Sequence, residues 1–162
     1  MHRLFISLVV GILALLTFVA CQKSTPTPAS AEAMIFGSYY GECLGERCIE
    51  MYRLDPKKQA LDEDALDKYP SFTAPYDGNY QARSHADYQR TLPLCQQVPA
   101  QLLAVTNGVI GQPDAGDWGG YYVEVNENGT RRFWLIDTQK SHIPPYLHAF
   151  TDSLRMHIQA LK

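Results

Sequence analysis

A glycine-rich loop holds the residues whose types and spacing could do chemistry. It spans residues 111–120, GQPDAGDWGG, and carries two carboxylates, Asp114 and Asp117. Carboxylate oxygens are ligands that a hard cation such as Ca²⁺ prefers, but the loop lacks the alternating acidic ligands and closing glutamate of the common calcium loop. Asp and Gly also dominate ordinary turns because of their backbone geometry. We therefore favour a turn here, and we keep a cation site and a ligand-binding loop as alternatives.

Aromatic side chains lie close to these carboxylates along the chain. Trp118 lies within the loop, and exposed aromatic residues are frequent anchors of binding surfaces. The alternative role for Trp118 is to fill the edge of the core. The predicted binding surface comprises Asp114, Asp117, Trp118, Tyr121 and Tyr122.

The other reactive residue types form no recognisable catalytic or metal-binding motif. The sequence contains neither an H-E-x-x-H pattern nor a G-x-S-x-G turn. Cys95 has no neighbour in sequence that would lower the pKa of its thiol, so we expect a buried, inert thiol. The sequence thus assigns no catalytic residue, no metal ligand and no cofactor.

Two cysteines fall in the first predicted hairpin, whose arms are residues 34–41 and 47–54. With Gly45 as the first residue of a two-residue type II′ turn, Cys43 faces Cys48 directly. Residues that face each other in a non-hydrogen-bonded pair have Cα atoms about 4.5 Å apart, which a disulfide tolerates. We therefore expect a Cys43–Cys48 disulfide. Two reduced thiols, or a bridge from one of them to the remaining cysteine, stay open as alternatives.

A second hairpin is predicted around Asn128-Gly129, because this dipeptide suits a type I′ turn. Its arms are residues 121–127 and 130–137, and the register places Val123 opposite Trp134. Both faces of these arms carry apolar residues, so the hairpin should lie centrally in a sheet, with a helix over at least one face. Residues 141–162 supply that helix, because apolar residues recur there at steps of three and four.

Weaker signals lie between the two hairpins. Residues 61–69 are acidic and suggest helical turns, residues 80–84 suggest a short strand, and residues 96–105 suggest a helix. Residues 107–120 read as a long loop because they are rich in glycine. Together the elements predict an α+β fold: an antiparallel sheet built from β-hairpins, with a C-terminal amphipathic helix packed on one face.

The N-terminus has the order of features typical of an export signal. Arg3 is followed by an almost entirely apolar run over residues 4–19, and small residues lead into Ala20-Cys21. This segment resembles the lipobox of bacterial lipoproteins, with Phe18 in place of the usual Leu. The resemblance implies cleavage before Cys21 and a diacylglyceryl group on its sulfur. An uncleaved membrane anchor and an ordinary secretory signal are the alternatives.

The resemblance divides the chain into three parts. Residues 1–20 are the signal peptide, and residues 21–33 are the lipidated cysteine and a Pro/Ser/Thr-rich tether that cannot bury enough surface to fold. Residues 34–162 are one globular domain of ordinary size. Attached acyl chains hold a protein at a membrane through about 0.8 kcal/mol per buried methylene.

The glycine-rich loop carries a second resemblance. With the strand that follows, it is similar to a stretch of small uncharacterised bacterial lipoproteins in which the loop reads G-C-P-D-C-x-D-x-G-G. Gln112 and Ala115 stand where that pattern has cysteines, and the resemblance implies no known activity.

These features predict a lipid-anchored protein of the bacterial cell envelope that acts as a binding or structural module. Its partners are the membrane, through the lipid on Cys21, and a protein or envelope component. Gln22 stands where an Asp often retains lipoproteins at the inner membrane, so the outer membrane is favoured in a Gram-negative cell. The net charge is −3 and no basic block is present, which argues against a nucleic-acid partner.

An enzyme is the alternative to a binding module. It would be an envelope hydrolase or ligand-binding enzyme that uses acidic residues gathered by folding, namely Asp114, Asp117 and Glu124. A deep pocket that holds two of these carboxylates would favour the enzyme. A shallow aromatic patch would favour the binding module.

Overall fold

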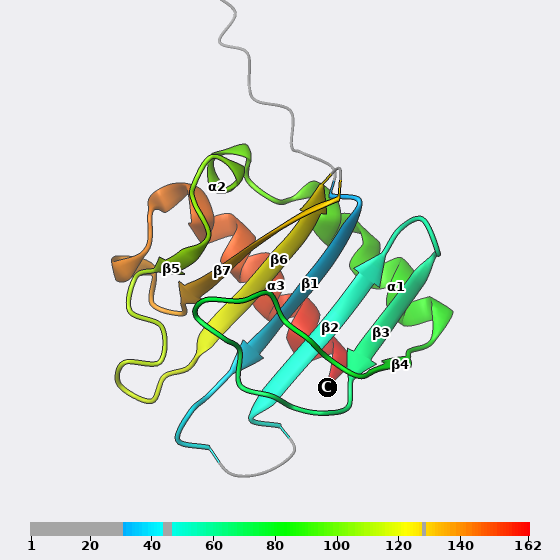
Figure 1. The fold of residues 1–162 in the computed structure, drawn as a ribbon, viewed down its shortest axis with the longest axis horizontal. Coiled ribbons are helices and arrows are strands. Elements are labelled where there is room, and N and C mark those ends of the chain that lie inside the picture. Colours follow the sequence, from blue (N-terminus) through cyan, green and yellow to red (C-terminus); the bar gives the residue numbers. More distant parts are fainter. Residues whose placement is uncertain (1–30, 44–46, 128) are drawn as a thin grey trace, which may run out of the picture.

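Seven strands form one mixed sheet in the part of the chain that the structure describes. The computed structural model describes residues 31–43, 47–127 and 129–162. The sheet has the order β4-β3-β2-β1-β6-β7-β5 (Figure 1), and neighbouring strands are antiparallel except for the parallel pair β5 and β7. The strands are β1 (Ala33–Tyr39), β2 (Ile49–Asp55), β3 (Ala60–Asp64), β4 (Tyr80–Ala82), β5 (Gly108–Ile110), β6 (Gly120–Glu127) and β7 (Thr130–Asp137).

Helices follow the strands at two places in the chain. The α-helices are α1 (His85–Thr91), α2 (Ala100–Leu103) and α3 (His148–Leu161), and the 3₁₀ turns are η1 (Leu92–Gln96), η2 (Lys140–His142) and η3 (Pro145–Leu147). Figure 1 shows α3 crossing behind the central strands of the sheet, with α1 on the same side. The α+β fold with a C-terminal helix on one face is therefore confirmed.

The hairpin of β6 and β7 has the predicted register. Val123 pairs with Trp134, and Tyr122 pairs with Leu135. Gly129 has φ of +78°, the left-handed conformation that a type I′ turn requires; Asn128 lies outside the described residues. Because β6 also pairs with β1, the hairpin lies inside the sheet, as its two apolar faces predicted.

The first face of the sheet is covered by helices. The apolar stripe of the C-terminal segment is buried against Phe36, Val123 and Trp134 from three neighbouring strands. The helix begins at His148, later than predicted, because Pro145–Leu147 form the separate turn η3 before it, with Pro144 at the N-cap of that turn. The buried stripe consists of Leu147, Phe150, Leu154, Ile158 and Leu161.

The second face of the sheet is covered by a long segment without regular structure, residues 65–79, which crosses in front of the central strands in Figure 1. Tyr76 is its anchor: it is 4% exposed and packs with Tyr122, Phe133 and Leu135. Asp64, the residue before this segment, holds the far end of it, because its carboxylate accepts hydrogen bonds from the Tyr76 hydroxyl (2.8 Å) and from the backbone of Asn79.

The register predicted for the first hairpin was wrong, although its disulfide is confirmed. Tyr39 pairs with Ile49, and the Tyr40 amide donates to the Cys48 carbonyl (2.9 Å), so Cys43 lies beyond the paired strands. A Cys43–Cys48 disulfide with a Cα–Cα distance of 5.5 Å closes the resulting loop. The strands end earlier than predicted, and the connection is longer than a two-residue turn. The predicted turn at Gly45 lies outside the described residues.

Three weaker predictions were also corrected in part. Residues 60–64 form strand β3 instead of helical turns, because Asp62 and Asp64 find partners on other segments. The helix predicted over residues 96–105 is the single turn α2, with Pro99 at its N-cap position. The glycine-rich segment contains β5, and no local pattern predicted its parallel pairing with β7. The predicted short strand near residue 80 is present as β4.

The N-terminal predictions fall mostly outside the described residues. Cys21 and the apolar run before it belong to residues 1–30, of which the structure describes nothing. Ala31 is 6% exposed and Ala33 begins β1, so ordered packing starts before the expected boundary at residue 34. Among the described helices, none is long and apolar enough to cross a membrane.

Candidate functional site

Asp114 fastens the glycine-rich loop to the rest of the domain. Its Oδ2 accepts hydrogen bonds from the Gly41 amide (2.7 Å) and the Tyr69 hydroxyl (2.9 Å), and its Oδ1 accepts one from the Gly119 amide (3.1 Å). Asp114 and Asp117 both have positive φ, 60° and 59°, a conformation that Asp tolerates better than most residues. The Asp114 carboxylate is therefore occupied by groups of the protein itself.

Trp118 packs back onto its own loop. A side-chain carbon added at Gly116 would lie 2.0 Å from the indole ring, and the indole lies 6.0 Å from the His142 ring, centre to centre. The indole Nε1 is buried and has no hydrogen-bond partner among the described residues. Trp118 thus closes the loop against the segment that follows β7.

The two tyrosines of the predicted binding surface point to opposite faces of β6. Tyr121 is 8% exposed in the core under α3, and Tyr122 is fully buried in the core under residues 65–79. The structure therefore brings Asp114, Asp117 and Trp118 together in one loop, and it places both tyrosines away from any shared surface.

A buried aspartate next to this loop orients a histidine. Asp137 is 0% exposed, and its carboxylate accepts from the Gln112 and Gln139 amides (2.9 and 2.8 Å) and contacts His142 Nδ1 at 2.8 Å. Burial acts to raise the pKa of Asp137, but the two backbone hydrogen bonds and the His142 ring outweigh it, so the pKa lies below its ordinary value. The arrangement connects the loop to η2 and fixes the orientation of the imidazole.

The three carboxylates considered for an enzyme do not share one site. Asp114 contacts Gly41, Tyr69 and Gly119, and Asp117 is an exposed residue of the loop. Glu124 lies on the face of β6 under the loop of residues 65–79, in a different set of partners. The Cys95 thiol is buried, which raises its pKa to about 12 and keeps it protonated. Within the described ranges, no three His, Cys, Asp or Glu side chains are placed to hold a metal ion.

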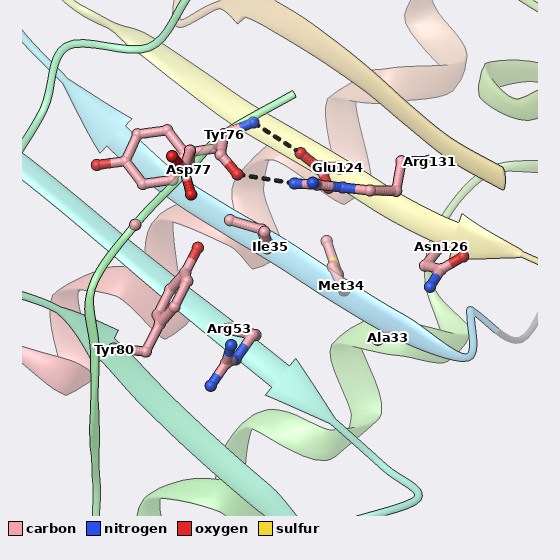
Figure 2. Close-up of a pocket in the computed structure, with 11 residues that line it drawn as sticks. Ala33, Met34, Ile35, Arg53, Tyr76, Asp77, Tyr80, Glu124, Asn126 and Arg131 are labelled. Atoms are coloured by element: carbon pink, nitrogen blue, oxygen red, sulfur yellow. Dashed lines mark hydrogen bonds and ion pairs between the residues drawn. The ribbon is translucent and has the colours of Figure 1, made fainter. Parts of the chain in front are cut away.

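A cavity of about 290 Å³ lies beside Glu124, on the second face of the sheet, between residues 76–78 of the covering segment and the strands beneath them. We call it the Arg53–Arg131 cavity after the two cations in its wall (Figure 2). Its volume is at the low end of the range for small-molecule sites, roughly 300–1,000 Å³. The lining residues are Ala33, Met34, Ile35, Arg53, Tyr76, Asp77, Gly78, Tyr80, Glu124, Asn126 and Arg131.

One wall is an ion pair that the fold holds in place. Glu124 is 3% exposed and accepts from Arg131 Nε (2.5 Å), the Tyr122 hydroxyl (2.6 Å) and the Tyr76 amide (3.0 Å). Arg131 also donates Nη2 to the Tyr76 carbonyl (2.7 Å), and its hydrogen bond with Glu124 raises its pKa further. The guanidinium is thereby fixed while its side chain stays 44% exposed.

The opposite wall is a second fixed guanidinium. Arg53 donates both Nε and Nη2 to Asp62 Oδ2 (3.0 and 2.7 Å) and lies 4.1 Å over the centre of the Tyr80 ring. Its side chain is 41% exposed. Figure 2 shows Arg53 and Arg131 on either side of Ile35, which contributes an apolar floor.

Two polar atoms of the lining residues lack partners. The Tyr80 hydroxyl and Asn126 Oδ1 are buried and make no hydrogen bond among the described residues. Buried polar groups in proteins are usually paired, so atoms left unpaired beside a cavity mark a place where a ligand or water completes the bonding.

Sequence reasoning missed this cavity, apart from Glu124. Arg53 and Tyr80 come from elements whose registers no local pattern sets. One signal was present: the predicted β6–β7 register already places Arg131 on the same face as Glu124, two pairs further along the hairpin. An acid and a base in that diagonal position can pair across a sheet.

Comparisons with known proteins do not add a relative to this description. No protein-family model matches the chain, and no match was found among curated proteins or among solved structures. The assignment of function therefore depends on the residues and the geometry described above.

Proposed function

We propose that the chain is a lipid-anchored protein of the bacterial cell envelope whose domain binds a small polar ligand in the Arg53–Arg131 cavity. The observation that carries the binding function is this cavity, between two guanidinium groups held by neighbouring carboxylates. Fixed donors around an apolar floor are typical of ligand sites, because groups that are already oriented lose little entropy on binding.

The anchor rests on the N-terminal sequence. The apolar run over residues 4–19 leads into Ala20-Cys21, and the polar segment after it joins the domain at β1. Ala33, the first residue of β1, also lines the cavity. The ligand site is thus built directly beside the point where the tether enters the domain.

Membrane fractionation tests the anchor. Cys21→Ser removes the sulfur that carries the lipid, so the variant should leave the membrane fraction and lose the mass of the acyl groups. Cys95→Ser is the matched control, because it removes a buried thiol and should leave fractionation unchanged. Retention of Cys21→Ser in membranes, together with an unprocessed N-terminus, would contradict lipid anchoring.

Thermal unfolding with a panel of small polar compounds tests the binding function. A compound that binds the cavity stabilises the folded state by about 2.7 kcal/mol at 100 times its dissociation constant. Ala33→Leu extends a side chain over the cavity floor and should abolish the stabilisation without lowering the unfolding temperature in the absence of ligand. If each stabilising compound acts equally on wild type and on Ala33→Leu, the cavity is not the binding site.

A further inference from the structure

The charges around the Arg53–Arg131 cavity are balanced in number. Two positive residues, Arg53 and Arg131, and two negative residues, Asp77 and Glu124, line it. Binding sites match the charge pattern of what they bind. The Asp77 carboxylate would repel a purely anionic ligand, and the two guanidinium groups would repel a purely cationic one.

Both the positive and the negative residues of the cavity have hydrogen-bonding groups that the protein leaves unused. Within the described residues, Nη1 of Arg53 and Nη1 of Arg131 donate to no group of the protein, because the recorded bonds use Nε and Nη2. Planar guanidinium groups recognise carboxylates well. The cavity therefore has free donors suited to a carboxylate.

The free acceptor lies on the segment that covers the second face. Asp77 is exposed and makes no hydrogen bond or ion pair with any described residue, whereas Glu124 is occupied by three donors. Figure 2 shows Asp77 next to Tyr76 on this segment, with the Arg131 guanidinium on the other side of the view. A carboxylate without a partner is the natural contact of an ammonium group.

The geometry points to a small zwitterion, an amino acid, as the ligand of the cavity. Its carboxylate is bound by Arg53 and Arg131, its ammonium group is bound by Asp77, and its apolar side chain lies over Ile35. This inference rests on the proposed binding function and narrows it to one ligand class. The ligand is neutral overall, so it leaves the charge balance of the cavity unchanged.

Three probes with the same apolar part test the inference by calorimetric titration of the full-length chain in mild detergent. They are leucine, isocaproate, which is leucine without the ammonium group, and isopentylamine, which is leucine without the carboxylate. Losing one charge-assisted contact weakens binding by about tenfold or more. Leucine should therefore bind at least about tenfold tighter than either analogue.

Substitutions should divide the probes by charge. Arg53→Gln should weaken the binding of leucine and isocaproate by about tenfold and leave the affinity for isopentylamine unchanged. Asp77 is an exposed residue of the covering segment with no partner to lose, so Asp77→Asn should not disturb the fold. It should weaken the binding of leucine and isopentylamine and leave the binding of isocaproate unchanged. Arg90→Gln is the matched control, because it removes a half-exposed arginine that pairs with Asp87 on α1, far from the cavity lining. It should change none of the three affinities.

The outcomes separate the inference from the proposed function. Equal affinity for the three probes, or a uniform effect of Arg53→Gln and Asp77→Asn on all of them, would overturn the zwitterion and leave a general binding site. No binding of leucine would overturn it too. The binding function itself falls only if no compound of the wider panel stabilises wild type more than Ala33→Leu.

Discussion

Arg131 should contribute more to stability than its exposed position suggests, because it neutralises a carboxylate that is almost fully buried. Glu124 is 3% exposed, and Arg131 Nε lies 2.5 Å from its Oε1. Arg131→Gln removes the charge and leaves the carboxylate buried. We expect this variant to unfold more easily, and the rest of the network sets the size of the effect.

The magnitude follows from burial and from the contacts that remain. Removing one partner of a buried ion pair costs about 3–5 kcal/mol. Here Glu124 keeps the hydrogen bonds from Tyr122 and Tyr76, and the Arg131 side chain is 44% exposed, so solvent already screens part of the interaction. The expected loss in the free energy of unfolding is therefore smaller, about 2–3 kcal/mol.

Urea denaturation of the chain that begins at Gln22, followed by tryptophan fluorescence, measures this loss. Lys57→Gln is the control that also removes one positive charge: Lys57 pairs with Glu32 at 3.1 Å, their side chains are 70% and 37% exposed, and an exposed pair contributes at most about 1 kcal/mol. Combining Arg131→Gln with Glu124→Gln removes the buried charge as well and should restore stability to within about 1 kcal/mol of wild type. Equal, small losses in Arg131→Gln and Lys57→Gln would refute the reasoning.

Three further predictions concern the sheet cover, a histidine and the cysteines. Truncation before Pro144 removes the helical cover of the first face and should abolish cooperative unfolding in calorimetry; a sharp transition in the truncated chain would show that the cover is dispensable. Burial lowers the pKa of His157 below its ordinary 6.5, so its contribution to stability is present above that pH and is lost as the pH falls through the folded-state pKa. His157→Gln should flatten this decline in urea titrations between about pH 7.5 and pH 5, and an unchanged decline would assign it to other groups. Mass mapping of the oxidised protein should find Cys43 joined to Cys48 with Cys95 alkylated only after unfolding, and a disulfide to Cys95 would contradict the fold of the first two strands.

Local signals predicted the elements whose partners lie close in sequence. The β6–β7 register followed from one dipeptide, because a two-residue turn leaves no choice of pairing. The C-terminal helix followed from its apolar stripe, because that stripe fits one face at helical spacing. In both cases the information lies within about twenty residues of chain, so distant segments could not override it.

Elements whose partners are distant were predicted poorly. Residues 61–69 read as acidic helical turns, but Asp62 pairs with Arg53 and Asp64 binds Tyr76 and Asn79. These tertiary contacts stabilise a strand and outweigh local propensity. The first hairpin failed for a related reason: a glycine in a longer loop looks the same in sequence as a glycine in a tight turn.

The candidate site combines both situations. The predicted loop residues Asp114 and Trp118 are used to hold the loop itself, and their chemistry could not be judged without knowing their partners. The cavity joins β1, β2, β6 and β7 to Asp77 on the covering segment, and only its Glu124–Arg131 part follows from a local register. Its other wall depends on how β2 and β4 lie in the sheet, which no nearby residues specify.

A crystal structure of the protein grown with leucine tests the central claim most directly. The account predicts leucine in the Arg53–Arg131 cavity, with its carboxylate on the two guanidinium groups and its ammonium group on Asp77. Leucine bound elsewhere, or a cavity that stays without leucine at concentrations that saturate the protein in solution, would contradict it.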